Sequence, residues 1–218
     1  MPDNKEILVW DILLRLFHWF LVISFVVAYL TAEESEQWHA YFGYAVMGLI
    51  SFRMVWGVIG SKYARFRDFV YSPRAVYRYL KSLLAKQPEY YIGHNPAGGW
   101  MIVALLISLF VVTVSGLKLY AIEEGRGPLA GGAADEITVI SAAYADEVRD
   151  EKSTGRERGR GRPRHKENIW EEVHEVSANL MLLLIFLHVA GVIVSSRLHH
   201  ENLVKAMITG KKKVLPDA

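Results

Sequence analysis

Two histidines, His174 and His188, lie fourteen positions apart in one largely apolar stretch of the chain, residues 171–197. At about 100° per residue of α-helix, that spacing brings both rings to within about 40° of the same face. A rise of about 1.5 Å per residue places them roughly 21 Å apart along the axis. Because imidazole is the commonest metal ligand among side chains, one helix is predicted to present two metal ligands to the same side.

The helix that carries these histidines is one of four predicted membrane spans. Hydrophobic residues make up 52% of the 218-residue chain and mean hydropathy is +0.16, which is more apolar than a typical soluble domain. Four apolar runs are long enough to cross a bilayer: 12–30, 38–59, 100–120 and 177–196. The sequence therefore predicts an all-α membrane protein, a four-transmembrane-helix bundle forming one domain over residues 1–218. A cleaved signal peptide is not expected, because the first run carries Arg15 and His18.

The positions of Lys and Arg predict the orientation of the spans. Basic residues are frequent in the loop 61–99 and from Arg197 onward, and they are absent from the first loop. Both termini and the loop 61–99 are therefore expected in the cytoplasm. The loop 121–173 is expected outside, although it carries basic as well as acidic residues, since long loops translocate with less regard to charge.

Two loop segments have characters of their own. Pro73–Lys86 is amphipathic at helical spacing, too short and too charged to span, and is predicted to lie along the membrane surface. Residues 153–166 are rich in Gly and Arg and are expected to be disordered, with a possible short helix before them at 135–148.

With this orientation, four histidines fall into two pairs of matching depth. His18 lies roughly 9 Å inside the cytoplasmic end of its span and His188 roughly 12 Å, by the helical rise. His39 and His174 each begin a span at the outer face. Each pair supplies a bis-imidazole axial set, so two b-type haems are predicted between the helices. The alternative for His39 or His174 alone is an interfacial residue, whereas ionisable groups inside a membrane are by default functional.

The absence of cysteine narrows the redox chemistry. Without thiolates the chain holds neither a disulfide nor a cysteine-ligated zinc ion or iron–sulfur cluster, and it lacks the CxxCH motif of covalent c-type haem. A redox cofactor must therefore be ligated by histidine or methionine, or be bound non-covalently. The net charge is only +2, and a nucleic-acid partner is not expected.

Three further residues are candidates for secondary roles. Arg15 and Arg53 are possible partners for haem propionates, with snorkelling to lipid phosphate as an equal alternative. His94 lies near the predicted inner haem and is a possible neighbour of a quinone site, although a residue of a helix-start turn is the favoured alternative. Three other histidines are not expected to be ligands: His165, His199 and His200.

Several motifs together resemble a known family. They are RLFHW (15–19), HAYFGY (39–44), YARFRDFVYSPRAVYRYLKSLL (63–84), GHNPAGG (93–99) and the closing run that ends HENLVKAMITGKK (200–212). This constellation resembles the bacterial cytochrome b561 and nickel-iron-hydrogenase b-type cytochrome family, except over about residues 130–165, where the chain carries its Gly/Arg-rich insert. The resemblance implies a di-haem four-helix bundle with His18, His39, His174 and His188 as axial ligands.

The resemblance also implies a function. Members of the resembled family transfer electrons between an extracytoplasmic redox partner and the quinone pool of the bacterial inner membrane, and the redox partner is a c-type cytochrome or a metalloenzyme subunit. The first alternative is a stand-alone superoxide:quinone oxidoreductase of related di-haem type. The second is a non-haem metal transporter, which the lack of Asp and Glu inside the predicted spans disfavours.

Overall fold

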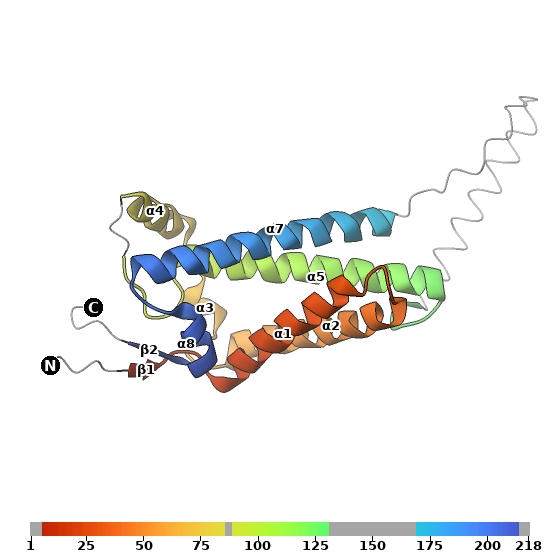
Figure 1. Ribbon diagram of the computed structural model, residues 1–218, viewed down its shortest axis with the longest axis horizontal. Helices are drawn as coiled ribbons and strands as arrows, with labels where there is room; N and C mark the ends of the chain where they lie inside the picture. Colours follow the sequence, from red (N-terminus) through yellow and green to blue (C-terminus); the bar gives the residue numbers. More distant parts are fainter. Residues whose placement is uncertain (1–5, 86–88, 131–168, 214–218) are drawn as a thin grey trace, which may run out of the picture.

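Four long helices dominate the computed structural model of the chain (Figure 1), which describes residues 6–85, 89–130 and 169–213. They are α1 (Ile12–Leu30), α2 (Glu36–Ile59), α5 (Pro96–Glu124) and α7 (Ile169–Leu198). Each is long and apolar enough to cross a membrane. The predicted helical membrane bundle is confirmed. The insert 153–166 and the possible helix at 135–148 lie outside the described residues.

The last two spans are longer than their apolar cores. Helix α5 begins at Pro96, where the side chain of Asn95 accepts a hydrogen bond from Gly98 N at 2.7 Å, a cap that hydropathy does not register. Helix α7 begins at Ile169, well before the apolar run. At about 1.5 Å per residue, helices of 29 and 30 residues reach roughly 45 Å and exceed the roughly 30 Å hydrocarbon core.

The helices pack in two pairs joined through α2 and α5. Helix α7 runs along α5 and α1 runs along α2, while α2 also contacts α5. Figure 1 shows both termini at one end of the bundle, as an even number of spans requires. The short helices α3 (Phe66–Phe69) and α4 (Pro73–Leu84) connect α2 to α5 at that same end.

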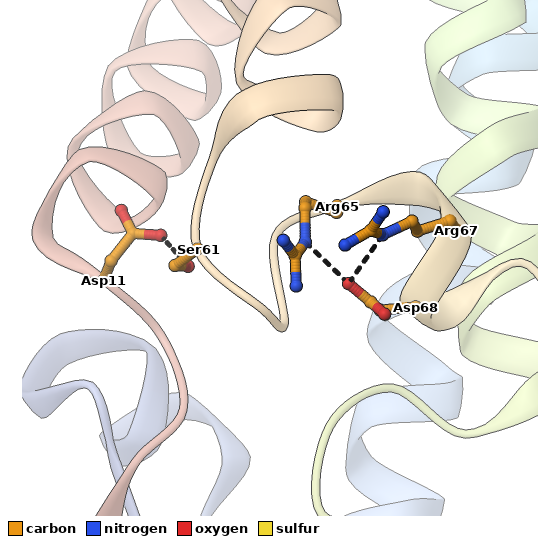
Figure 2. Close-up of polar contacts among 5 residues, drawn as sticks. All are labelled: Asp11, Ser61, Arg65, Arg67 and Asp68. Atoms are coloured by element: carbon orange, nitrogen blue, oxygen red, sulfur yellow. Dashed lines mark hydrogen bonds and ion pairs between the residues drawn. The ribbon is translucent and has the colours of Figure 1, made fainter.

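Asp11 ties the start of α1 to the end of α2. Its carboxylate caps α1 by accepting a hydrogen bond from Leu14 N at 2.8 Å. It also accepts one from Ser61 Oγ at 2.5 Å, drawn in Figure 2, and one from Trp56 Nε1 at 3.2 Å. Figure 2 also shows Asp68 of α3 paired with Arg65 at 2.8 Å.

Three short elements from the two ends of the chain pack together at the same end of the bundle: β1 (Glu6–Leu8), α8 (Leu203–Thr209) and β2 (Lys211–Lys213). We call this unit the clasp. The strands β1 and β2 pair antiparallel, with Ile7 opposite Lys212. Helix α8 leads into β2. Its C-cap is Gly210, whose φ of 80° lies in the left-handed region. The sequence did not predict this small sheet, because three-residue strands carry no usable periodicity.

A small apolar core lies under the clasp and fixes it to the spans. Its members come from the segment before α1, from α1 itself, from the loop after α2 and from α8. They are Val9, Trp10, Leu14, Phe17, Ala64 and Ala206.

Candidate functional site

The structure brings together the two histidines predicted at the outer level. The ring centroids of His39 on α2 and His174 on α7 are 5.9 Å apart and the rings lie nearly perpendicular, at 83°. Two imidazoles that bind one metal ion from opposite sides hold their ligating nitrogens about 4 Å apart, given metal–nitrogen distances of about 2 Å. The observed ring separation is compatible with such a pair.

Backbone carbonyls fix the protonation of both rings. His39 Nδ1 lies 2.8 Å from Ala28 O, and His174 Nδ1 lies 2.9 Å from Val112 O. A carbonyl oxygen only accepts, so each Nδ1 must carry the proton. In a neutral ring this leaves Nε2 with the free lone pair, which is the state that a metal-ligating histidine requires.

Gly116 gives His174 room beside α5. A Cβ built at this glycine would lie 2.8 Å from His174 Cε1 and 3.0 Å from its Nδ1. Ser115 Oγ lies 3.3 Å from the same nitrogen. Gly116 carries no signal in the sequence beyond its small size, and only the structure reveals its contact with a candidate ligand.

The inner pair, His18 on α1 and His188 on α7, is less closely placed, because no ring contact joins the two residues in the described part of the chain, although they lie within electrostatic range of each other. His18 Nδ1 is buried and has no hydrogen-bond partner. The ring meets Trp19 edge-on, with centroids 5.2 Å apart. Unlike the outer pair, this pair does not have its tautomers fixed by backbone carbonyls within the described residues.

Arg53 is held inside the protein within electrostatic range of His94. Arg53 is only 2% exposed, and its guanidinium lies over the rings of Phe66 and Phe69, at 4.7 Å and 5.6 Å from their centroids. Its Nη1 is buried without a hydrogen-bond partner. These cation–π contacts hold the charge in place and leave a donor available to an acidic group.

Arg15 is used differently from Arg53. Its Nη1 donates a hydrogen bond to Ile208 O of α8, which ties α1 to the clasp. Its Nε is nevertheless buried without a partner. The Nη1 atom of Arg15 therefore has a structural role, whereas its Nε remains available to donate a hydrogen bond to a ligand.

His94, just before α5, is enclosed by aromatic side chains. Its ring packs on Trp10 and Phe69, with centroids 4.3 Å and 5.0 Å away, and it is within electrostatic range of His188. Burial lowers the pKa of His94 to about 3, and the positive charges of Arg53 and Lys212 lower it further. Its Nδ1 is enclosed without a partner, although the residue as a whole is partly exposed. The side chain is therefore neutral at physiological pH.

The candidate residues near the predicted cytoplasmic end of the spans fit a haem with its propionates. Four of their buried polar atoms lack hydrogen-bond partners: Arg15 Nε, His18 Nδ1, Arg53 Nη1 and His94 Nδ1. Each unpaired buried group costs about 1–3 kcal/mol, so partners are expected for them. The arginine donors match carboxylates such as haem propionates, and the imidazole of His18 can ligate iron through its other ring nitrogen, Nε2. Open space lies beside Gly43, Gly48 and Gly191, where an added Cβ would meet nothing within 4 Å.

Comparison with known proteins identifies the family to which the chain belongs. The chain matches the family model of the prokaryotic cytochrome b561 over residues 9–210. The chain belongs to the prokaryotic cytochrome b561 family. No curated protein and no solved structure matches it. The family expected from the motifs is thus confirmed, and with it a membrane b-type cytochrome that binds haem and transfers electrons.

Sequence reasoning misses several residues that shape the site of this cytochrome b561. The carbonyls of Ala28 and Val112 carry no signal in residue type, because every residue has such an acceptor. Trp10 reaches His94 only through the fold of the segment before α1. Among the remaining histidines, His199 packs on Tyr90 at 5.9 Å, and His165 lies outside the described residues.

Proposed function

We propose that this cytochrome b561 is a di-haem subunit that carries electrons across the membrane between an extracytoplasmic redox partner and the quinone pool. His39 and His174 are the axial ligands on the outer side, and His18 and His188 are those on the cytoplasmic side. The observation that carries the proposal is the outer pair, in which both Nδ1 atoms are bound to carbonyls and both Nε2 atoms are free to ligate.

Bis-histidine ligation determines what the cofactor does here. A bound haem supplies reversible one-electron exchange at its iron. Two histidines bound to one haem iron would leave it no open position for oxygen, so the site would transfer electrons without activating a ligand. Arg53, held by its aromatic neighbours, and the Nε of Arg15 would bind propionates.

Helix α7 spans the distance between the two sites. The separation of His174 from His188, roughly 21 Å along the helix, would place one site near each face of the bilayer. The outer site would serve a c-type cytochrome or a metalloenzyme subunit. The inner site, with neutral His94 beside it, would exchange electrons with quinone. We infer that the protein lies in the bacterial inner membrane with both termini in the cytoplasm and forms a single domain.

The proposal is tested by haem loss in four single variants. Purified wild type and the His18→Ala, His39→Ala, His174→Ala and His188→Ala variants are compared by haem quantitation and reduced-minus-oxidised spectra. We expect two haems per wild-type chain, loss of one and the same haem in H18A and H188A, and loss of the other in H39A and H174A. The control is His200→Ala, an exposed residue beyond α7, which should retain both haems.

Two results would contradict this assignment. If H18A and H174A lost the same haem, the pairing would be wrong. If all four variants bound as much haem as wild type, the ligand set would be wrong. Reduction of the purified protein by superoxide, with no other protein present, would instead favour a stand-alone superoxide:quinone oxidoreductase.

A further inference from the structure

Helix α4 divides its surface into three arcs. One arc faces the protein and includes Tyr79, which is 1% exposed and meets the ring of Tyr91 at 5.8 Å. The second arc is apolar but exposed: Tyr77, Leu80 and Leu84 are 72%, 46% and 86% exposed. At about 100° per residue, these three side chains fall within one arc of about 60°.

The third arc is basic and borders the exposed apolar one. It holds Arg74, Arg78 and Lys81, which also fall within about 60° of each other. All three residues are exposed, and within the described part of the chain none of them forms an ion pair. An amphipathic helix with a basic border beside large apolar side chains is typical of helices that lie in a membrane interface.

The contacts of α4 fix its depth at the end of the bundle. Trp100, 42% exposed near the start of the span α5, donates a hydrogen bond from Nε1 to Tyr71 O at 2.8 Å, just before α4 begins. Tryptophan at a span end marks the headgroup level of a bilayer. Figure 1 shows α4 at the end of the bundle where α7 finishes and both termini lie.

We propose that α4 binds the anionic phospholipid headgroups of the leaflet on the side of the two termini. Tyr77, Leu80 and Leu84 insert between acyl chains, and the basic arc meets the phosphates. A protein partner is the less favoured occupant, because the apolar arc is edged by three positive charges at the depth of the headgroups. The proposal is independent of the haem assignment.

Labelling experiments are straightforward because the chain contains no cysteine. Nitroxide labels at Leu84→Cys and Arg78→Cys are compared by EPR in nanodiscs of phosphatidylcholine with and without phosphatidylglycerol. With anionic lipid, we expect the Leu84 label to be several-fold more accessible to oxygen than to a water-soluble nickel chelate, and the Arg78 label to show the reverse preference. Unchanged haem content in both variants shows that the fold is intact.

A second measurement tests the charges. After detergent extraction, phosphatidylglycerol retained by the protein is counted by native mass spectrometry. We expect Arg78→Gln to retain measurably less of it, whereas Lys205→Gln, which removes an exposed charge from α8 at the same end of the molecule, retains as much as wild type.

Three outcomes would overturn the proposal. The first is a Leu84 label as accessible to the nickel chelate as the Arg78 label in anionic nanodiscs. The second is equal loss of retained lipid in R78Q and K205Q. The third is a Leu84 label protected from both oxygen and nickel, which would show that protein rather than lipid covers the arc.

Discussion

At the scale of single residues, backbone geometry prepares the candidate outer ligands in advance. Val112 O and Ala28 O each accept a hydrogen bond from the protonated Nδ1 of one imidazole, so in the neutral ring Nε2 is unprotonated before any metal arrives. Such preorganisation avoids the cost of choosing the tautomer when the cofactor binds. The outer pair is therefore the better defined of the two sites, while the inner one still has polar atoms without partners.

Gly116→Ala should disturb the outer haem selectively. The added methyl would lie 2.8 Å from His174 Cε1, so the ring must shift and its hydrogen bond to Val112 O must weaken. We expect a changed low-spin EPR signal and an altered reduction potential for the outer haem, or a lower content of it. The inner haem in the same sample is the internal control. Identical signals in variant and wild type would show that Gly116 does not position His174.

The residue types of the candidate site could be predicted from the sequence, but their surroundings could not. The matching depths of His39 and His174 alone predict that they form a pair, and in the structure their ring centroids are 5.9 Å apart. Histidine inside an apolar span is a strong signal because it is costly there. The contact of Gly116 with His174 joins residues far apart in the chain, and a single sequence contains no measure of that distance.

At the scale of elements, Asp11 holds two spans together with one carboxylate. Burial opposes its ionisation, but hydrogen bonds from Ser61, Leu14 and Trp56 outweigh it and lower the pKa of Asp11 below its ordinary value of 3.8. Because the pKa of Asp11 is lower in the folded state than in the unfolded state, its ionisation stabilises the fold at pH values above the unfolded-state pKa. That stability is lost as pH falls through the folded value.

Asp11→Ala should loosen the junction of α1 and α2. Loss of an N-cap costs about 0.5–2 kcal/mol, and the hydrogen bonds from Ser61 and Trp56 are lost as well. We expect a lower apparent Tm in detergent at neutral pH, and Asp11→Asn, which can still cap, should lose less. The difference between D11A and wild type should narrow toward acidic pH. Glu6→Gln, at an exposed pair with Lys211, serves as the control.

Element boundaries show where hydropathy stops being informative. Span α1 begins and ends where the apolar run does, at Ile12 and Leu30. Helix α7 continues through Glu171 and Glu172, because acidic residues in a first turn favour the helix dipole even outside the membrane. The spacing of apolar residues predicts an amphipathic helix over Pro73–Lys86, whereas α4 in the structure ends two residues earlier, at Leu84.

At the scale of the whole molecule, the clasp between the chain ends is held by a buried ion pair. Lys212 Nζ lies 2.8 Å from Glu201 Oε2, with side chains 5% and 13% exposed. Tyr90 donates a hydrogen bond to the other carboxylate oxygen at 2.8 Å. Sequence could not have predicted this contact, because Lys212 lies within a run of three lysines that reads as a solvated tail.

Lys212→Met should open the clasp. Breaking a buried pair by removing one partner costs about 3–5 kcal/mol, because Glu201 keeps an uncompensated charge. We expect faster proteolysis of the C-terminal segment and a lower Tm, with partial recovery in the double variant Lys212→Met/Glu201→Gln. Lys211→Met is the matched control, since its pair with Glu6 is exposed and worth about 0–1 kcal/mol. Equal effects at both lysines would contradict the role of the buried pair.

The pairing of β1 with β2 also sets an order of assembly. Residues 6–8 leave the ribosome early, but their strand partner, residues 211–213, is made only after all four spans. Until then Trp10 and Arg15 lack their hydrogen-bond acceptors, Gly210 O and Ile208 O, so this end of the bundle is incomplete. The clasp therefore closes late in biosynthesis, after the last span, and the segment before α1 must wait for its partner while the membrane helices assemble.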